Sequence, residues 1–346
     1  MKTEKKIRIA VIGCGRISKN HFGSIEQLSS EFELIAVCDN DPQVLAEHVD
    51  RYKVPGYESI DQLLESEELD LVTLCTPSGL HAAQTIKAAQ SGVNVITEKP
   101  MATKWEDGLA MVKACDEANV KLFVVKQNRR NSTLQLLKRA VAEKRFGKIH
   151  MVHLNVFWTR PQEYYDRAKW SGTWDMDGGA FMNQATHYVD LMHWLIGPVE
   201  SLHAMISTHR DIEVEDTGVV NIKWRNGALG SMAVTMCTYP NNLEGSITIL
   251  GEKGTVRIGG VAVNEIQEWN FAEAKDYDSE IAEANYQTTS VYGFGHPPYF
   301  KNVADVLRGQ DEPETDGREG LKSLELLISI YRSARDHREV GLPLNL

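Results

Sequence analysis

The first third of the chain alternates short apolar runs with stretches of helical periodicity. The apolar runs are IRIAVIG, ELIAVCD, LDLVTLCTP, VNVITEKP and VKLFVVKQ, and segments such as SGLHAAQTIKAAQSG separate them. Strands that are apolar throughout must be buried on both faces, and their alternation with helices requires parallel strands joined by crossovers. The pattern therefore predicts an α/β domain over residues 1–125, built on a doubly wound parallel sheet.

The pattern changes after a basic helix, STLQLLKRAVAEKRFG, because strands then follow one another directly. These strands are KIHMVHLNVFW, PVESLHAMIST, DTGVVNIKWRNGALGSMAVTMC, GSITILGEKGTVRIG and AVNEIQEW. Hairpin turns are indicated at residues 225–227 and 251–254. The succession predicts an antiparallel sheet in a second, α+β domain over residues 126–346, which an amphipathic helix over 318–335 closes.

Composition narrows the classes of partner. The 346 residues exceed what one core usually supports, which agrees with two domains. A net charge of -11 argues against a broad surface for nucleic acid or anionic membranes. No stretch approaches the apolar length of a membrane span, and the five cysteines are scattered without a CxxC pair. We therefore expect no nucleic-acid or membrane partner, and a reducing, cytoplasmic location.

The stretch IAVIGCGRIS forms the turn from the first predicted strand into the first helix. Gly13 and Gly15 permit a tight turn in which the backbone approaches a pyrophosphate at the helix N-terminus. Ser18 stands where the dinucleotide fingerprint has glycine or alanine. Asp39 ends the second strand, where a carboxylate accepts hydrogen bonds from the adenosine ribose and repels a 2′-phosphate. These residues predict NAD rather than NADP, with Asp41 capping the next helix.

Two further motifs, CTPSGLH and ITEKPM, follow the fourth and fifth predicted strands. Both lie at the carboxyl edge of the sheet, where ligands of open α/β folds bind. His81, taken alone, also fits a helix-entry position. The residues expected to wall the cofactor are Thr76, Pro77, Ser78 and His81.

Lys99 stands between Glu98 and Pro100, and proline restricts the backbone of the residue before it. A lysine held at the nicotinamide end of the sheet could hydrogen-bond a substrate hydroxyl and stabilise the alkoxide that develops as hydride leaves. The alternative is a surface lysine that pairs with Glu98. The residues alone do not decide between these interpretations.

The stretch GGAFMNQATHYVD places polar side chains in an apolar helix that we predict over residues 177–197. Asn183, His187, Asp190 and Trp194 share one face of that helix. Polar groups are costly there unless satisfied, so the face is expected to meet a cleft. His187 is then either a general base for an alcohol proton or a core histidine with satisfied hydrogen bonds. A metal site is the poorer interpretation, because the sequence has neither HExxH nor a cysteine cluster.

The motifs AVIGCGRIS, CTPSGLH, ITEKPMA and GGAFMNQATHYVD resemble, in order and spacing, those of the Gfo/Idh/MocA family of NAD(P)-dependent sugar and polyol oxidoreductases. The resemblance implies a Rossmann domain followed by a domain with an open antiparallel sheet that often mediates oligomerisation. It also implies catalytic roles for Lys99 and His187. The family commonly has aspartate where this chain has Asn183, which suggests that Asn183 binds or orients substrate. Cofactor contacts are implied for Gly13, Gly15, Arg16, Ile17, Asp39, Thr76, Pro77, Ser78, His81, Glu98 and Lys99.

Longer stretches, including FVVKQNRRN and NVFWTRPQEYYDRAKWSGTW, are similar to the UDP-N-acetylglucosaminuronate 3-dehydrogenases of bacterial surface-polysaccharide (O-antigen) synthesis, the WlbA/WbpB group. This similarity implies oxidation of the 3-hydroxyl of UDP-N-acetyl-D-glucosaminuronic acid, with NAD as cofactor, in a homotetramer that needs no metal. Whether NADH leaves or is reoxidised in place by 2-oxoglutarate stays open. Basic and aromatic side chains of these stretches, Arg129 among them, could meet the diphosphate, the carboxylate and the uracil. The expected substrate contacts are Asn183, Arg160, Tyr165, Lys169 and Gln127.

Two other functions stay open on the sequence. One is a dehydrogenase of the same family that acts on a free polyol such as inositol, which needs no cations for a diphosphate. The other is a non-catalytic NAD-binding regulator. The presence of both Lys99 and His187 argues against the regulator.

Overall fold

The computed structural model describes residues 5–288, 291 and 293–344. Within these ranges, no helix combines the length and the apolar character needed to cross a membrane. All five cysteines carry free thiols.

The chain divides into two compact units. The first contains residues 1–126 and 296–324, and the second contains residues 127–295 and 325–346. The first break lies beside the boundary predicted from the sequence. The predicted second domain continued without interruption to the end of the chain, whereas the structure places residues 296–324 in the first unit.

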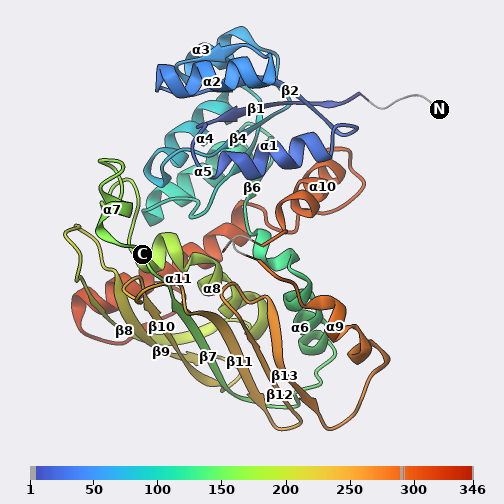
Figure 1. Cartoon of the computed structure of the whole chain (residues 1–346), viewed down its shortest axis with the longest axis vertical. Helices are drawn as coiled ribbons and strands as arrows, with labels where there is room; N and C mark the ends of the chain where they lie inside the picture. The colour runs from blue at the N-terminus through green and yellow to red at the C-terminus, as the bar shows by residue number, and fades with distance from the viewer. Residues whose placement is uncertain (1–4, 289–290, 292, 345–346) are drawn as a thin grey trace. The chain divides into compact units, whose positions relative to one another are not determined.

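Parallel strands form the sheet of the first unit. They are β1 Ile7–Ile12, β2 Phe32–Cys38, β3 Gly56–Tyr57, β4 Leu71–Leu74, β5 Asn94–Thr97 and β6 Leu122–Val124 (Figure 1). Among the described residues their order is β3-β2-β1-β4-β5-β6, and every pairing is parallel. The winding therefore reverses between β1 and β4, the point where ligands of such sheets bind. The predicted doubly wound fold is confirmed.

The helices of the first unit come from two distant parts of the chain. Those between the strands are α1 Ser18–Gln27, α2 Pro42–Tyr52, α3 Ile60–Ser66, η1 Ser78–Leu80, α4 His81–Gln90 and α5 Trp105–Glu117. α10, His296–Leu307, joins the same core. Its Phe300 meets the rings of Phe32 and His21 edge-on, with centroids 5.7 and 5.4 Å apart. This packing explains why residues 296–324 belong to the first unit.

The second unit is built on a mostly antiparallel sheet. Its strands are β7 Ile149–Phe157, β8 Val199–Ser207, β9 Thr217–Trp224, β10 Leu229–Thr235, β11 Glu244–Gly251, β12 Gly254–Gly259, β13 Glu265–Phe271 and β14 Val340–Gly341. In the described chain they follow the order β13-β12-β11-β7-β10-β9-β8-β14 (Figure 1). β9–β10 and β11–β12 pair as the predicted hairpins, while β10 runs parallel to β7. The predicted α+β class is confirmed.

Alternate residues of the central strands are buried on one face of this sheet, as in β9, where Val220, Ile222 and Trp224 are buried. The indole nitrogen of Trp224 donates to the carbonyl oxygen of Met192, 3.2 Å away, so the segment that carries His187 packs on this face. The helical segments are η2 Gln127–Arg130, α6 Ser132–Ala142, α7 Gln162–Tyr165, η3 Ala180–Gln184, α8 Thr186–Leu191, η4 Met192–Ile196, η5 Asp276–Glu280 and α9 Ile281–Ala284. The predicted closing helix is α11, Gly317–Asp336.

The regular helix predicted over residues 177–197 is wrong in its geometry. Only α8 is α-helical, and the flanking η3 and η4 are π-helical turns. The amide of Ala185 donates to the carbonyl of Ala180 at 2.8 Å, which is the wider hydrogen bond of a π turn. Such turns often occur at functional sites, and they shift the faces that simple helical spacing assigns.

Candidate functional site

The glycine turn between β1 and α1 is tightly constrained. Gly13 has φ +88°, and a Cβ there would lie 2.8 Å from the backbone of Cys75 and Thr76. Only glycine tolerates both this dihedral and this approach of two strand ends. A Cβ at Gly15 would meet nothing within 4 Å, so its backbone is accessible at the start of α1. The geometry fits a pyrophosphate cradle.

Asp39 joins the end of β2 to the glycine turn. Its Oδ2 accepts from the amide of Cys14 at 2.7 Å, and its Oδ1 accepts from the amide of Asp41 at 2.9 Å. Each carboxylate oxygen can accept a second hydrogen bond, so the ribose contact predicted for Asp39 is sterically and chemically compatible with these two. Asp41 caps α2 as predicted. The Ser18 hydroxyl donates to the carbonyl of Gly15 at 2.7 Å, so serine suits this fingerprint position.

The motifs after β4 and β5 are tied together by His81. One ring nitrogen of this buried histidine lies 2.9 Å from the carbonyl oxygen of Thr76, and the other lies 2.9 Å from that of Pro100. Burial lowers the pKa of His81, so the ring is neutral at physiological pH and donates to one carbonyl at a time. His81 therefore positions the two loops, and its direct contact with a cofactor stays a prediction.

Glu98 is a buried carboxylate beside Lys99. The residue is only 4% exposed, and its Oε1 accepts a hydrogen bond from Nε2 of His21 at 2.8 Å. Burial alone would raise the pKa of Glu98, but the neighbouring His21 and His296 imidazoles hold it well below its usual range. Glu98 Oε2 accepts from the backbone amide of Lys99 at 3.0 Å. This hydrogen bond comes from the Lys99 backbone, so the alternative pairing of the lysine side chain with Glu98 stays a prediction. The Lys99–Pro100 peptide bond is cis.

The same group, His21, Glu98 and His296, brings its ligand atoms within 4.8 Å of one another. Both ring nitrogens of His21 have hydrogen-bond partners. Nε2 contacts Glu98, and Nδ1 lies 2.8 Å from the hydroxyl of Thr73. We therefore interpret His21 and Glu98 as a hydrogen-bonded pair that fixes the backbone before Pro100, with Nε2 of His296 3.6 Å from the same carboxylate oxygen.

His187, on α8, is 5% exposed and contacts Gln127 of η2. The amide nitrogen of Gln127 lies 3.1 Å from Nε2 of His187. An amide nitrogen can only donate, so Nε2 accepts, and the neutral ring carries its proton on Nδ1. An unprotonated Nε2 is the form that can accept a proton. The structure brings Gln127 against the histidine, and its predicted contact with the substrate stays a prediction.

Arg129 and Asp190 fasten α8 to η2. Arg129 donates from two nitrogens to the two oxygens of Asp190, each at 2.7 Å, and both residues are buried. The guanidinium also lies over the ring of Trp194, 5.5 Å from its centroid. Arg129 is therefore engaged by Asp190, and its expected contact with the substrate stays a prediction. The side chains of residues 187, 190 and 194 share one face, toward residues 127–138. Asn183, predicted on the same face, contacts Asp177.

Residues far along the chain satisfy the first amides of η3. The carbonyl and the Oε1 of Glu215 accept from the amides of Ala180 and Phe181, both at 2.9 Å. The Tyr331 hydroxyl accepts from the amide of Met182 at 3.1 Å and donates to Glu215 Oε1 at 3.0 Å. This arrangement replaces a local N-cap. It also explains Gly179, where a Cβ would lie 1.7 Å from Glu215 Oε2. The sequence did not point to Glu215, because no local pattern links it to η3.

Replacing Glu215 with glutamine should make stability less dependent on pH. Burial raises the pKa of Glu215 from 4.5 to about 7, so the folded state keeps a proton that the unfolded state releases. Stability from this group is therefore full below pH 4.5 and falls as pH rises to about 7. Glutamine cannot ionise, so the variant should gain about 2 to 3 kcal/mol relative to wild type between about pH 5 and about pH 8.

Denaturant unfolding of both proteins at the two pH values measures this change. Glu213→Gln is the matched control, because it removes the same charge from an exposed side chain in the same loop. A Glu215→Gln variant whose stability follows the wild-type pH dependence would rule out the buried, protonated carboxyl.

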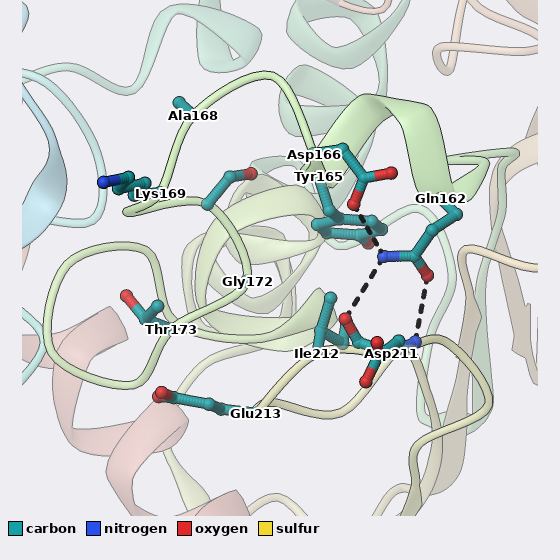
Figure 2. A pocket seen from close by; sticks show the side chains of 11 residues that line it. Gln162, Tyr165, Asp166, Ala168, Lys169, Gly172, Thr173, Asp211, Ile212 and Glu213 are labelled. Atoms are coloured by element: carbon teal, nitrogen blue, oxygen red, sulfur yellow. Dashed lines mark hydrogen bonds between the residues drawn. The ribbon is translucent and has the colours of Figure 1, made fainter.

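A pocket of about 280 Å³ lies beside α7 in the second unit. At its edge, the amide nitrogen of Gln162 donates to Oδ1 of Asp166 at 3.0 Å and to the carbonyl oxygen of Asp211 (Figure 2). The amide oxygen of Gln162 accepts from the backbone amide of Asp211. Tyr165 and Lys169, both predicted substrate contacts, line it. Arg160 does not line this pocket. Its guanidinium donates to the carbonyl of Thr159 at 2.7 Å and lies near the rings of Trp158 and Tyr164.

Two sequence models of one oxidoreductase family match the chain. The one described as "Oxidoreductase family, NAD-binding Rossmann fold" matches residues 7–126, and "Oxidoreductase family, C-terminal alpha/beta domain" matches residues 138–342. The chain belongs to the Gfo/Idh/MocA oxidoreductase family. The resemblance found in the sequence is thereby confirmed for both halves of this family member.

Two solved structures are closely similar to this family member. The WlbA dehydrogenase from Bordetella pertussis is 62% identical over 99% of both chains, with a TM-score of 0.97. The WlbA dehydrogenase from Chromobacterium violaceum is 63% identical over 99% of this chain and 98% of that chain, with a TM-score of 0.95. Both are complexes with NADH and UDP-GlcNAcA. D-apiose dehydrogenase from Paraburkholderia graminis is 26% identical over 98% of this chain and 91% of its own length.

Proposed function

We propose that this family member oxidises the 3-hydroxyl of UDP-N-acetyl-D-glucosaminuronic acid to a ketone, with NAD as hydride acceptor, in surface-polysaccharide sugar synthesis. The observation that carries the proposal is the 62–63% identity, over nearly the whole chain, to two dehydrogenases solved with NADH and that UDP-sugar. The cradle at Gly13 and the carboxylate of Asp39 fit NAD.

The reaction moves one proton and one hydride from the sugar. His187 Nε2, whose lone pair accepts from Gln127 in the free protein, takes the proton of the 3-hydroxyl once that hydroxyl displaces the Gln127 amide. Lys99, whose backbone is fixed by Glu98, stabilises the negative charge on that oxygen as the carbonyl forms. NAD supplies the nicotinamide ring that receives the hydride from C3. Asn183 positions the sugar, and Tyr165 and Lys169 contribute to substrate binding, with Arg160 in support.

We propose that the remaining expected cofactor contacts lie around the cradle at Gly13. Gly15 and Arg16 are exposed just before α1, and Ile17 stands at its N-cap. We propose that Thr76, Pro77 and Ser78, at the carboxyl edge of β4, wall the nicotinamide half. The free cysteines and the NAD requirement support a cytoplasmic location.

We propose a homotetramer that uses the outer face of the second sheet. Apolar side chains are exposed there on adjacent strands, with Met205 paired opposite Val219 and Leu229 opposite Met151. An exposed apolar face on a sheet favours association with another protein surface. Sedimentation analysis should detect a tetramer, and a concentration-independent monomer would contradict the proposal.

Incubation with UDP-N-acetylglucosaminuronic acid and NAD tests the function. We expect absorbance of NADH to appear with this substrate and to be absent or far weaker with myo-inositol, the polyol alternative. Parallel reactions with 2-oxoglutarate test in-place reoxidation, because recycling would produce 3-keto sugar without accumulation of NADH. Binding of NAD without formation of keto sugar in either reaction would favour a regulator and refute the proposal.

A further inference from the structure

Asp177 is a buried carboxylate at the junction of two segments of the candidate site. Its residue is 3% exposed, and Oδ2 accepts from the backbone amide of Gly172 at 2.7 Å. Its Oδ1 accepts from the amide nitrogen of Asn183. A carboxylate is costly to bury unless its oxygens are hydrogen-bonded, so these two contacts hold Asp177 in one orientation.

This contact fixes the orientation of the Asn183 amide. The nitrogen and the oxygen of a planar amide lie on opposite sides of Cγ, and Asp177 can only accept when ionised. The nitrogen therefore faces Asp177, and the Asn183 oxygen is directed away from it as a hydrogen-bond acceptor. Asn183 belongs to η3, whose amides are capped by Glu215 and Tyr331, so its backbone is also held.

Asp177 connects this amide to the pocket described above. Gly172, which binds Asp177, lines that pocket together with Lys169 and Tyr165. Gly172 has φ +74°, and a Cβ there would lie 2.8 Å from Ile212. The turn thus has little freedom, and the Asp177 carboxylate links a rigid pocket wall to the side chain of Asn183.

We propose that Asp177 is a positioning residue for the dehydrogenase reaction, which orients Asn183 so that its amide oxygen accepts a hydrogen bond from a sugar hydroxyl. The inference rests on the proposed function. Its consequence is that positions 177 and 183 must carry complementary groups. A carboxylate at 183 would oppose that of Asp177, and two close carboxylates cannot both stay ionised without strong repulsion.

A charge swap between the two positions tests the proposal. In Asp177→Asn, the new amide nitrogen faces a donor of either Asn183 or Gly172, so one of the two hydrogen bonds is lost. In Asn183→Asp, two carboxylates face each other. Each single variant should lower kcat/KM for the UDP-sugar by about 10- to 100-fold, because small displacements of a positioning group are costly. In the double variant, the asparagine introduced at position 177 can donate to the new carboxylate and still accept from Gly172. The double variant should recover to within about fivefold of wild type.

Three further measurements separate positioning from general damage. KM for NAD should stay near the wild-type value in all variants, while Asn183→Asp should lose more activity at about pH 9 than at about pH 6, where the carboxylates can share a proton. Asp175→Asn removes a charge from an exposed residue of the same loop and should stay within about twofold of wild type. Thermal unfolding identifies any variant that fails to fold.

Two outcomes would overturn the inference. A double variant no more active than the weaker single variant would show that the two side chains do not act as a pair. A fully active Asp177→Asn variant would show that the orientation of Asn183 does not depend on this carboxylate. A wild-type protein that neither binds nor oxidises the UDP-sugar would refute the proposed function itself, so the two failures are distinguishable.

Discussion

Replacing His187 with asparagine should lower kcat for the UDP-sugar by about 10²- to 10⁴-fold, the usual contribution of a general base. An asparagine amide cannot accept a proton near neutral pH, whereas the histidine Nε2 is held unprotonated by Gln127. The residue is only 5% exposed, and asparagine is polar and only slightly smaller than histidine. The substitution should therefore leave no large cavity in the core. Initial rates of NADH formation measure the effect.

Affinity for NAD is the control for this variant, because α8 belongs to the second unit and the glycine cradle belongs to the first. The unfolding midpoint should change little. A His187→Asn enzyme that retains more than about a tenth of wild-type turnover would show that another group accepts the proton. His187 would then be the core histidine that the sequence also allowed.

Replacing Lys99 with methionine should lower kcat by about 10²- to 10³-fold, the cost of removing a donor that stabilises developing negative charge. Methionine keeps an unbranched side chain and removes the charge. The backbone of residue 99 should stay in place, because the hydrogen bond from its amide to Glu98 does not involve the side chain. Steady-state kinetics with saturating NAD measures the loss.

Lys121→Met is the matched control for Lys99→Met. Lys121 is exposed in the same unit, and its contact with Asn94 is made by its backbone amide, which the substitution leaves intact. The control should keep near wild-type turnover. If Lys99→Met changed activity no more than Lys121→Met, Lys99 would be the surface lysine of the alternative interpretation.

The fold was predictable wherever a local pattern decides it. Wholly buried strands alternating with helices determined the parallel sheet, and hairpin turns at 225–227 and 251–254 determined two pairings of the second sheet. The assignment of α10 to the first unit was not predictable. Phe300 meets Phe32 through a contact between distant parts of the sequence, and neither segment carries a sign of the other.

The candidate site shows the same division. Gly13 could be recognised because a left-handed turn between strand and helix requires glycine. Gln127 and Arg129 looked like ligand-binding residues, and their contacts with His187 and Asp190 appear only in three dimensions. Glu215 gave no signal at all, although its carboxyl caps η3. The basic stretches of the sequence predicted positive charge near the site. They did not predict which of these side chains form ion pairs within the protein.

The central claim is that the hydrogen at C3 of the sugar passes directly to NAD. The most direct test uses UDP-N-acetylglucosaminuronic acid labelled with deuterium at C3 and mass analysis of the reduced cofactor. The NADH formed should carry the deuterium. Unlabelled NADH, or a keto group formed at another carbon, would contradict it.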